Sequence, residues 1–447
     1  MKRLLQFFRP GLAVSLALSF LILPLASLAQ TAPEAAPTAN TGDTAWMLVS
    51  TVLVLLMIIP GLALFYGGLV RRENIVAALM QTFATCAIVS VLWVIAGYSL
   101  AFTSGSSFLG GFDRVLGKGI EIGTLSGTIP ESVFLVFQLT FAAITVALIL
   151  GAVADRIKFS SLLCFVSLWL FFVYVPVAHW VWGPEGFLGG TGVADFKGFL
   201  GFGPFIDFAG GAVVHINSGI AGLVAAIVLG KRTKGIPKEM GNVAFAVIGA
   251  SLLWVGWFGF NAGSAVAAGG RAGMAMLVTH TAAAMAALAW MFAEWMTEGK
   301  PSVAGTVSGA VAGLVAITPA SGFVGVGGAL AIGLAGGVIC YFACTSIKNR
   351  FGYDDSLDVF GVHCVGGIVG SILTGVFAES AIGGVAGALE GNTMQLVAQT
   401  VGSLVVLVYS GAVTFVLLKI TQLFFGLRVS PEVERKGLSV ELHGQTI

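Results

Sequence analysis

Long apolar runs follow one another through most of this chain, and they limit its fold more than any other feature. A transmembrane helix needs about 20 such residues to cross a hydrocarbon core about 30 Å thick. Charged residues make up only 10% of the chain, against about 25% in a soluble domain, so lipid must be its main solvent. We therefore predict an all-α polytopic membrane protein of eleven transmembrane helices, near residues 45–69, 76–103, 131–154, 160–182, 208–230, 242–263, 273–296, 302–319, 325–347, 357–377 and 395–425.

The first residues predict a secretory signal peptide. Lys2, Arg3 and Arg9 precede an apolar run, and a small-residue cleavage site follows it at Ser27-Leu28-Ala29. A polar stretch rich in Pro and Ala comes next, which favours cleavage over an uncleaved first helix. The expected organisation is a signal peptide (1–29), an outer segment (30–44), a transmembrane domain (45–427) and a cytoplasmic tail (428–447).

Charge outside the spans predicts the orientation. Only Arg114, Lys118, Lys197 and Arg271 fall in the predicted outer segments, and the predicted cytoplasmic segments hold many more basic residues. The positive-inside rule and the signal peptide both place the N-terminus outside and the C-terminus in the cytoplasm, as expected for a plasma-membrane protein. A net charge of +1 without long basic runs argues against nucleic-acid binding.

A short motif occurs twice. Residues 214–222 and 362–370 both read V-H-x-x-x-G-I-x-G, in the fifth and tenth predicted spans. The two copies are five spans apart, and because this number is odd they run in opposite directions, so we expect two inverted five-helix repeats plus a final helix. Such repeats place a permeation site at their interface near the midplane, so the pore should lie between the halves.

Both copies carry a histidine at similar predicted depth. His215 lies eight residues after Asp207 on a helix entering from outside, about 12 Å deep, and His363 enters from the other side. The two could meet mid-membrane as a proton relay or pathway. They could instead form an interhelical hydrogen bond that only holds the helices together, which is worth only about 0.6 kcal/mol on average. We favour the pathway for this pair, expect His280 to be a satisfied interior residue, and leave His179 undecided.

With these motifs, the chain resembles the ammonium transporter (Amt/Mep/Rh) family, specifically its bacterial Amt branch, over roughly residues 45–444. The resemblance rests on four segments: Asp207 to Asn217, Trp257 to Ser264, Thr318-Pro319-Ala320, and Asp354-Asp355-x-x-Asp358-x-Phe360-x-x-His363-x-x-Gly366-Gly367.

The resemblance implies a role for each matching position. It implies an outer ammonium site (Phe137, Phe141, Trp182, Ser264), a phenyl gate (Phe141, Phe260), a twin-histidine pore (His215, His363) and supporting residues (Asp207, Trp257, Thr318, Asp358). It also implies a homotrimer with one pore per subunit and docking of a PII-type signalling protein at the tail. We expect no cofactor, no metal and no enzymatic activity. On their own, the phenylalanines fit ordinary packing, and Trp182 fits an interfacial aromatic belt.

This chemistry suits ammonium. Aromatic faces hold a cation, worth roughly 2 kcal/mol when desolvated, and Ser264 can accept a hydrogen bond that ammonium donates and potassium cannot. An apolar pore penalises a bare charge, and only ammonium can lose a proton to enter it. We hypothesise that the histidine pair relays this proton and makes transport electrogenic. If ammonia crossed without any ammonium current, the relay idea would fail.

The tail departs from the family pattern. Ser439 stands where the family usually has Asp, and Gln445 where it has Glu, which puts the detail of PII coupling in doubt. Asp155 replaces a usual Glu before Arg156. Three alternatives stay open: an ammonium sensor or transceptor, a Rh-like ammonia gas channel, and an intramembrane enzyme with histidine-bound metal. Trp182 and Ser264 argue against the second, and the lack of a close-set ligand cluster argues against the third.

Overall fold

A computed structural model describes residues 38–190, 197–235 and 240–447, and the predicted signal peptide lies outside these residues. Asn40–Ile447 forms a compact unit separate from Met1–Ala39, and everything below concerns that unit. Apolar side chains of its helices supply almost the whole core.

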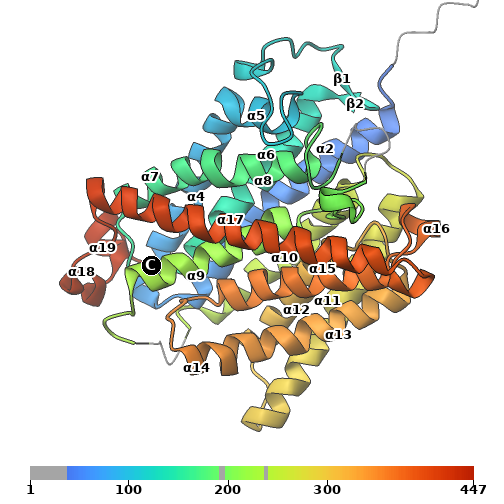
Figure 1. Ribbon diagram of the computed structural model, residues 1–447. Coiled ribbons are helices and arrows are strands. Elements are labelled where there is room, and N and C mark those ends of the chain that lie inside the picture. The colour runs from blue at the N-terminus through green and yellow to red at the C-terminus, as the bar shows by residue number, and fades with distance from the viewer. Residues whose placement is uncertain (1–37, 191–196, 236–239) are drawn as a thin grey trace, which may run out of the picture. The chain divides into compact units, whose positions relative to one another are not determined.

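Ten helical segments of the described part are long and apolar enough to cross a membrane (Figure 1). They are Thr41–Leu69 (α2, Thr41–Leu56; η1, Met57–Leu62; α3, Ala63–Leu69), Arg72–Phe102 (η2, Arg72–Asn74; α4, Ile75–Leu92; η3, Trp93–Gly97; α5, Tyr98–Phe102), Glu131–Leu150 (α6), Phe159–Trp182 (α7, Phe159–Trp169; η5, Leu170–Tyr174; α8, Val175–Trp182), Gly211–Leu229 (η7, Gly211–Ile216; α9, Asn217–Leu229), Val243–Gly263 (α10), Gly270–Glu298 (α11), Val326–Phe351 (α13, Val326–Phe342; η8, Ala343–Ile347; α14, Lys348–Phe351), Phe360–Phe377 (η9, Phe360–Cys364; α15, Val365–Phe377) and Thr393–Phe425 (α17).

The eighth predicted span is a shorter helix than expected. Helix α12, Val303–Ile317, has 15 residues, and the side chain of the preceding residue, Ser302, accepts from the Gly305 N–H. At 1.5 Å per residue it is about 22 Å long, less than a hydrocarbon core of about 30 Å. The described part is therefore a polytopic helical membrane protein with ten helices of spanning length, and the predicted eleventh falls short of that length.

The remaining elements are short. Six of them lie in the connections between the long helices: β1 (Leu125–Ser126) pairs antiparallel with β2 (Ile129–Pro130) in a small hairpin, and η4 (Val115–Gly117), η6 (Phe199–Gly201), α16 (Ser380–Gly383) and η10 (Ala388–Glu390) lie in loops. After α17 the chain forms α18 (Pro431–Lys436) and α19 (Leu438–His443). In Figure 1 these two lie at one end of α17, which we call the tail end, and α16 lies at the opposite end, the vestibule end.

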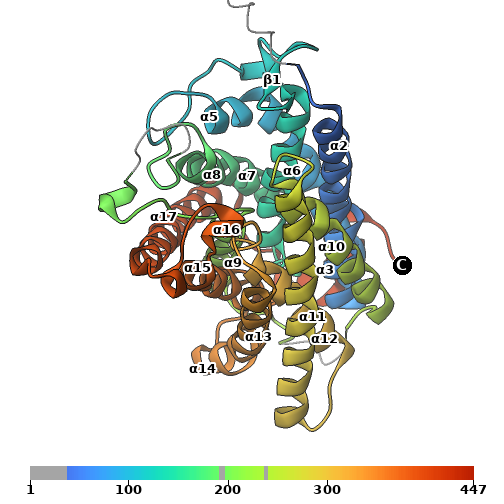
Figure 2. The same cartoon turned by 90° about the vertical axis from the view of Figure 1, so that its right-hand side faces the viewer.

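Small residues let the long helices approach closely. Helices α11, α12 and α13 lie side by side in Figure 2. A Cβ on Gly313 of α12 or on Gly333 of α13 would lie 2.5 Å from the Ala282 carbonyl oxygen of α11. Helix association in lipid depends on such close packing, because burial away from water contributes little there. The 62 glycines of the chain are thus partly explained by helix contacts.

A buried ion cluster joins three connections at the tail end. Arg232 pairs with Asp354 (2.5 Å) and Asp155 (3.3 Å), and Asp155 also pairs with Arg156 (2.9 Å). Burial opposes ionisation of both partners, but the hydrogen bonds and charge of Arg232 hold the pKa of Asp354 below its usual value. The Asp that replaces the family's usual Glu at 155 therefore still bridges two arginines.

Candidate functional site

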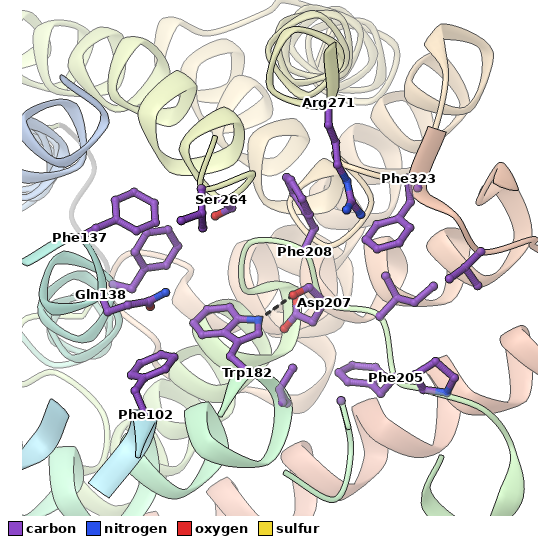
Figure 3. A pocket seen from close by; sticks show the side chains of 18 of the residues that line it. Phe102, Phe137, Gln138, Trp182, Phe205, Asp207, Phe208, Ser264, Arg271 and Phe323 are labelled. Atoms are coloured by element: carbon purple, nitrogen blue, oxygen red, sulfur yellow. Dashed lines mark hydrogen bonds between the residues drawn. The ribbon is translucent and has the colours of Figure 1, made fainter. Parts of the chain in front are cut away.

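A cavity of about 590 Å³ lies at the vestibule end, and we call it the vestibule. Its wall contains five residues singled out in the sequence, which come from four parts of the chain: Phe137, Phe141, Trp182, Asp207 and Ser264. Figure 3 shows the side chains of Phe137, Trp182 and Ser264 gathered around one part of this cavity. The vestibule thus brings together residues that are up to 127 positions apart, from 137 to 264.

Aromatic rings form one side of the vestibule. Phe137 and Phe141 lie one turn apart on α6 with ring centroids 4.9 Å apart. Trp182, the last residue of α8, meets Phe141 at 5.8 Å with its plane turned by 86°. The face of an aromatic ring can hold a cation within about 6 Å of its centroid.

Ser264 supplies an acceptor at the same place. Its hydroxyl donates to the Phe260 carbonyl oxygen one turn earlier, at 2.8 Å. A hydroxyl has one proton and two lone pairs, so the Ser264 oxygen can accept a hydrogen bond while its proton is donated to Phe260. The combination of ring faces and one oxygen suits a cation that also donates hydrogen bonds.

Asp207 supports the vestibule wall through the backbone. Its carboxylate accepts from four N–H groups at the start of the next span, those of Gly210, Gly211, Ala212 and Val213, at 2.5 to 3.0 Å. Its carbonyl oxygen accepts from the Trp182 indole N–H at 2.7 Å (Figure 3). Burial raises the pKa of the Asp207 carboxyl above its ordinary value, although the four N–H groups act in the opposite direction. Asp207 therefore positions η7 and Trp182 together.

Two stacked phenyl rings close the inner end of the vestibule. Phe141 and Phe260 lie with centroids 4.2 Å apart and planes 23° from parallel. Both side chains are buried. A passage at this point would require the rings to move.

Beyond the rings, His215 and His363 face each other. Their Nδ1 atoms are 3.2 Å apart and their ring planes differ by 15°. One nitrogen must donate and the other accept, which two neutral imidazoles can satisfy. A small enclosed cavity of about 10 Å³, room for about one water-sized molecule, lies beside the pair and has a mainly apolar lining.

Trp257 and Thr318 hold the His215 ring in place. The Trp257 indole stacks on His215 at 5.4 Å and 19°. Its N–H donates to the Thr318 hydroxyl at 2.9 Å, and that hydroxyl donates to the Leu314 carbonyl oxygen. Trp257 of α10 therefore contacts His215 directly, and Thr318, the residue after α12, contacts Trp257.

Asp358 lies at the opposite end of the molecule from the vestibule. It pairs with Lys348 at 2.7 Å. The nearby Asp355, which lies in one of the family segments but was assigned no role from the sequence, accepts from the Phe360 N–H at the start of η9, the turn that carries His363. Burial, with the charge of Asp358, raises the pKa of Asp355 to about 6.

The sequence did not single out several residues of the vestibule. Phe208, Phe323 and Arg271 line its far side, and Gln138 lies between the two phenylalanines of α6 in sequence (Figure 3). The buried Gln138 Oε1 has no partner among the described residues. The one sequence signal for Arg271 was its positive charge in a predicted outer segment, on the same side as the predicted cation site.

The two remaining span histidines have other surroundings. Both ring nitrogens of buried His179 contact carbonyl oxygens, those of Ala101 in α5 (2.9 Å) and of Ser106 in the loop after it (2.7 Å). His280 is exposed on α11 beside Trp254. The expectation of an interior His280 is therefore wrong for the single chain, because α11 is apolar on all sides and its sequence does not show which face turns inward.

These features define the class of protein. A bundle of helices of spanning length encloses an aromatic cavity, a closed pair of rings and a small buried cavity beside two histidines, which is the arrangement of a membrane transporter or channel. Residues 45–447 match the model of the Ammonium Transporter Family, and the chain belongs to this family.

Relatives and solved structures agree with this assignment. The chain is 50% identical to an ammonium transporter of Aquifex aeolicus over 91% of this chain and 93% of the relative. It is 46% identical to one of Bacillus subtilis, over 90% and 98%. The crystal structure of Candida albicans Mep2 matches with a TM-score of 0.80 and 34% identity, over 88% of each chain. The protein is thus an ammonium transporter of a membrane and not an enzyme.

Proposed function

We propose that ammonium binds in the vestibule between Phe137, Phe141, Trp182 and Ser264, loses its proton there, and continues as ammonia past the twin histidines. The observation that carries this proposal is the contact series through Phe260. This ring stacks on Phe141 at 4.2 Å and lies 6.1 Å from His215. One residue therefore joins the vestibule to the histidine pair.

Recruitment depends on ring faces and on one oxygen. A desolvated cation over Trp or Phe gains roughly 2 kcal/mol or more. The Ser264 oxygen, whose own proton is held by the Phe260 carbonyl, can accept an ammonium N–H. Potassium has no hydrogen to donate, so this contact favours ammonium.

Deprotonation follows from the apolar path. The cavity around the histidines is lined mainly by aliphatic and aromatic side chains, among them Leu148, Val311 and Phe260. A bare charge would be strongly penalised there. Ammonia can enter, and potassium cannot become neutral.

The histidine pair offers the displaced proton a route. His215 Nδ1 and His363 Nδ1 share one hydrogen bond, and the buried His215 Nε2 has no partner among the described residues. A donor or acceptor entering the cavity could bind that nitrogen. Proton passage along the pair would make transport electrogenic.

The recruitment step is tested by ammonium-dependent current in proteoliposomes. Ser264→Ala should raise KM for ammonium several-fold with little change in kcat, and Trp182→Leu should raise it further. Ser251→Ala is the matched control, because Ser251 makes the same bond to the residue four positions earlier on α10 but is exposed. Unchanged KM in both vestibule variants would overturn the proposed site.

Eleven crossings in two inverted five-helix repeats plus a final helix are part of the same proposal. Helix α12 is followed by Thr318, Pro319, Ala320 and Ser321, and the buried chain continues toward Val324. This extension supports a crossing despite the short helix. Reporter fusions after Lys300 and after Gly384 should report opposite sides of the membrane.

We also propose the signal peptide (1–29), the outer segment (30–44), the domain (45–427) and the tail (428–447), with the tail in the cytoplasm and the protein in the bacterial inner membrane.

A homotrimer is supported by His280. An ionisable residue in the middle of a spanning helix is costly against lipid, and His280 is exposed on α11. A second subunit would cover it, while lipid would cover apolar residues such as Val408 and Leu423 of α17. Native mass spectrometry in mild detergent should show three copies. A PII-type protein is proposed to dock at the tail end.

A sensor is the second candidate function. A solved structure described as a sensor Amt protein matches with a TM-score of 0.81 and 27% identity, over 90% of this chain and 98% of that chain. A sensor would bind ammonium at the vestibule without sustained transport. Binding without current would favour it.

A further inference from the structure

Arg271 lies in the vestibule with its guanidinium over two phenyl rings. Its Cζ lies 4.5 Å from the Phe323 ring centroid and 5.0 Å from that of Phe208. Its Nε–H donates to the Gly322 carbonyl oxygen at 3.0 Å. Figure 3 shows this side chain reaching from α11 to the side of the cavity opposite Phe137. The vestibule therefore has two aromatic cation sites, and the chain's own side chain fills one of them.

The position is electrostatically unfavourable for a cation. Arg271 is the second residue of α11, where the helix N-terminus carries partial positive charge. Among the described residues, no ion pair includes Arg271. The carboxylate that shares the vestibule, Asp207, is occupied by four backbone N–H groups. The positive charge is thus held by ring faces and one carbonyl, without a neutralising partner.

A fixed charge at this place acts on the transported ion. Arg271 is the only basic residue among the described residues that line the vestibule. Any ammonium that enters the cavity approaches this charge, and the two like charges repel each other. The guanidinium also occupies Phe208 and Phe323, so a second ammonium cannot bind there.

We propose that Arg271 is a specificity-determining residue that sets the affinity of the vestibule for ammonium and limits its occupancy to one cation. This inference rests on the proposed recruitment site at Trp182. Removing the charge lowers KM and opens the second aromatic site, and keeping the charge preserves KM.

The test compares Arg271→Gln with Arg271→Lys in proteoliposomes at two salt concentrations. At roughly 10 mM sodium chloride, Arg271→Gln should lower KM by about threefold, and Arg271→Lys should stay near the wild-type value. At roughly 1 M, where the Debye length is about 3 Å, the difference between Gln and wild type should largely vanish. Lys118→Gln is the matched control, because Lys118 is an exposed basic residue of another predicted outer segment that does not line the vestibule.

The outcomes separate this inference from the proposed function. A KM of Arg271→Gln that equals wild type at both salts, or that differs by the same factor at both, would overturn the role of charge. An increased KM would overturn it too. If Trp182→Leu, measured alongside, raises KM while Arg271→Gln leaves it unchanged, only the Arg271 inference fails. If Trp182→Leu also leaves KM unchanged, the recruitment site itself fails.

Discussion

A Cβ placed on Gly219 would lie 2.3 Å from the backbone nitrogen of Cys364. Gly219 lies four residues after His215, and Cys364 directly follows His363. The reciprocal contact exists: a Cβ on Gly367, four residues after His363, would lie 3.1 Å from the Ile216 nitrogen and 2.5 Å from the Gly211 carbonyl oxygen. In each copy of V-H-x-x-x-G, the glycine therefore lets its helix pass close to the helical turn that carries the histidine of the other copy.

Replacing these glycines should separate the two turns. Gly219→Ala or Gly367→Ala forces the backbones apart, and overpacking of this kind costs about 1–3 kcal/mol or more. We expect a lower thermal unfolding temperature in detergent and loss of current, because the 3.2 Å contact between His215 and His363 is broken. Gly327→Ala on α13 is the control, since a Cβ there meets nothing within 4 Å. If Gly219→Ala behaves like Gly327→Ala, the crossing is not tight.

The repeated motif predicted that His215 and His363 meet, because the features it uses are local in sequence. The placement of His215 and His363 followed from helix rise and span direction, and the structure brings the two rings together. Arg271 could not be placed in the same way. Its partners Phe208 and Phe323 come from two separate loops, and no periodicity reports how such loops fold.

Helix lengths and faces were predicted less well. The apolar run at 302–319 contains a helix of only 15 residues, because Ser302 caps its start and the chain turns after Ile317. The outward face of His280 was missed, because a helix that is apolar all round shows no inward side in its sequence.

Thr318→Val should destabilise the histidine pair. The change removes the acceptor of the buried Trp257 N–H and leaves this donor unpaired, which costs about 1–3 kcal/mol. Because Trp257 stacks on His215, the current should fall as well. Thr281→Val removes an exposed hydroxyl that bonds within α11 and serves as the control in thermal unfolding. Equal effects of the two changes would contradict a positioning role for Thr318.

Asp355→Asn should change how stability depends on pH. Burial and the charge of Asp358 raise the folded pKa of Asp355 to about 6 from an ordinary 3.8. Between these values the folded state binds more protons than the unfolded state, so wild-type stability falls as pH rises from about 4 to about 6. The Asn oxygen can still accept from the Phe360 N–H without this penalty.

The stability of Asp355→Asn relative to wild type should therefore increase across that window and level off above it. Thermal unfolding in detergent from pH 4 to pH 8 measures this difference. Asp113→Asn, at an exposed turn position, is the control. A difference for Asp355→Asn that does not vary with pH would contradict the raised pKa.

Ser439→Asp should hold the tail more firmly. The Ser439 hydroxyl accepts from the Ala77 N–H in the first turn of α4, and the Leu438 N–H donates to the Asn74 side chain beside it. The family's usual carboxylate at this position would add its charge to the helix N-terminus, worth about 0.3–1 kcal/mol. Hydrogen exchange of α18 and α19 should slow in Ser439→Asp and accelerate in Ser439→Ala. Unchanged exchange in both would show that this contact does not hold the tail.

The central claim is that ammonium yields its proton and passes His215 and His363. The most direct measurement is ammonium-induced current in proteoliposomes holding the native chain, His215→Ala or His363→Ala, with folding checked by thermal unfolding. We predict a current from the native chain and its loss in both folded variants. Unchanged current and unchanged selectivity over potassium in both variants would contradict the account.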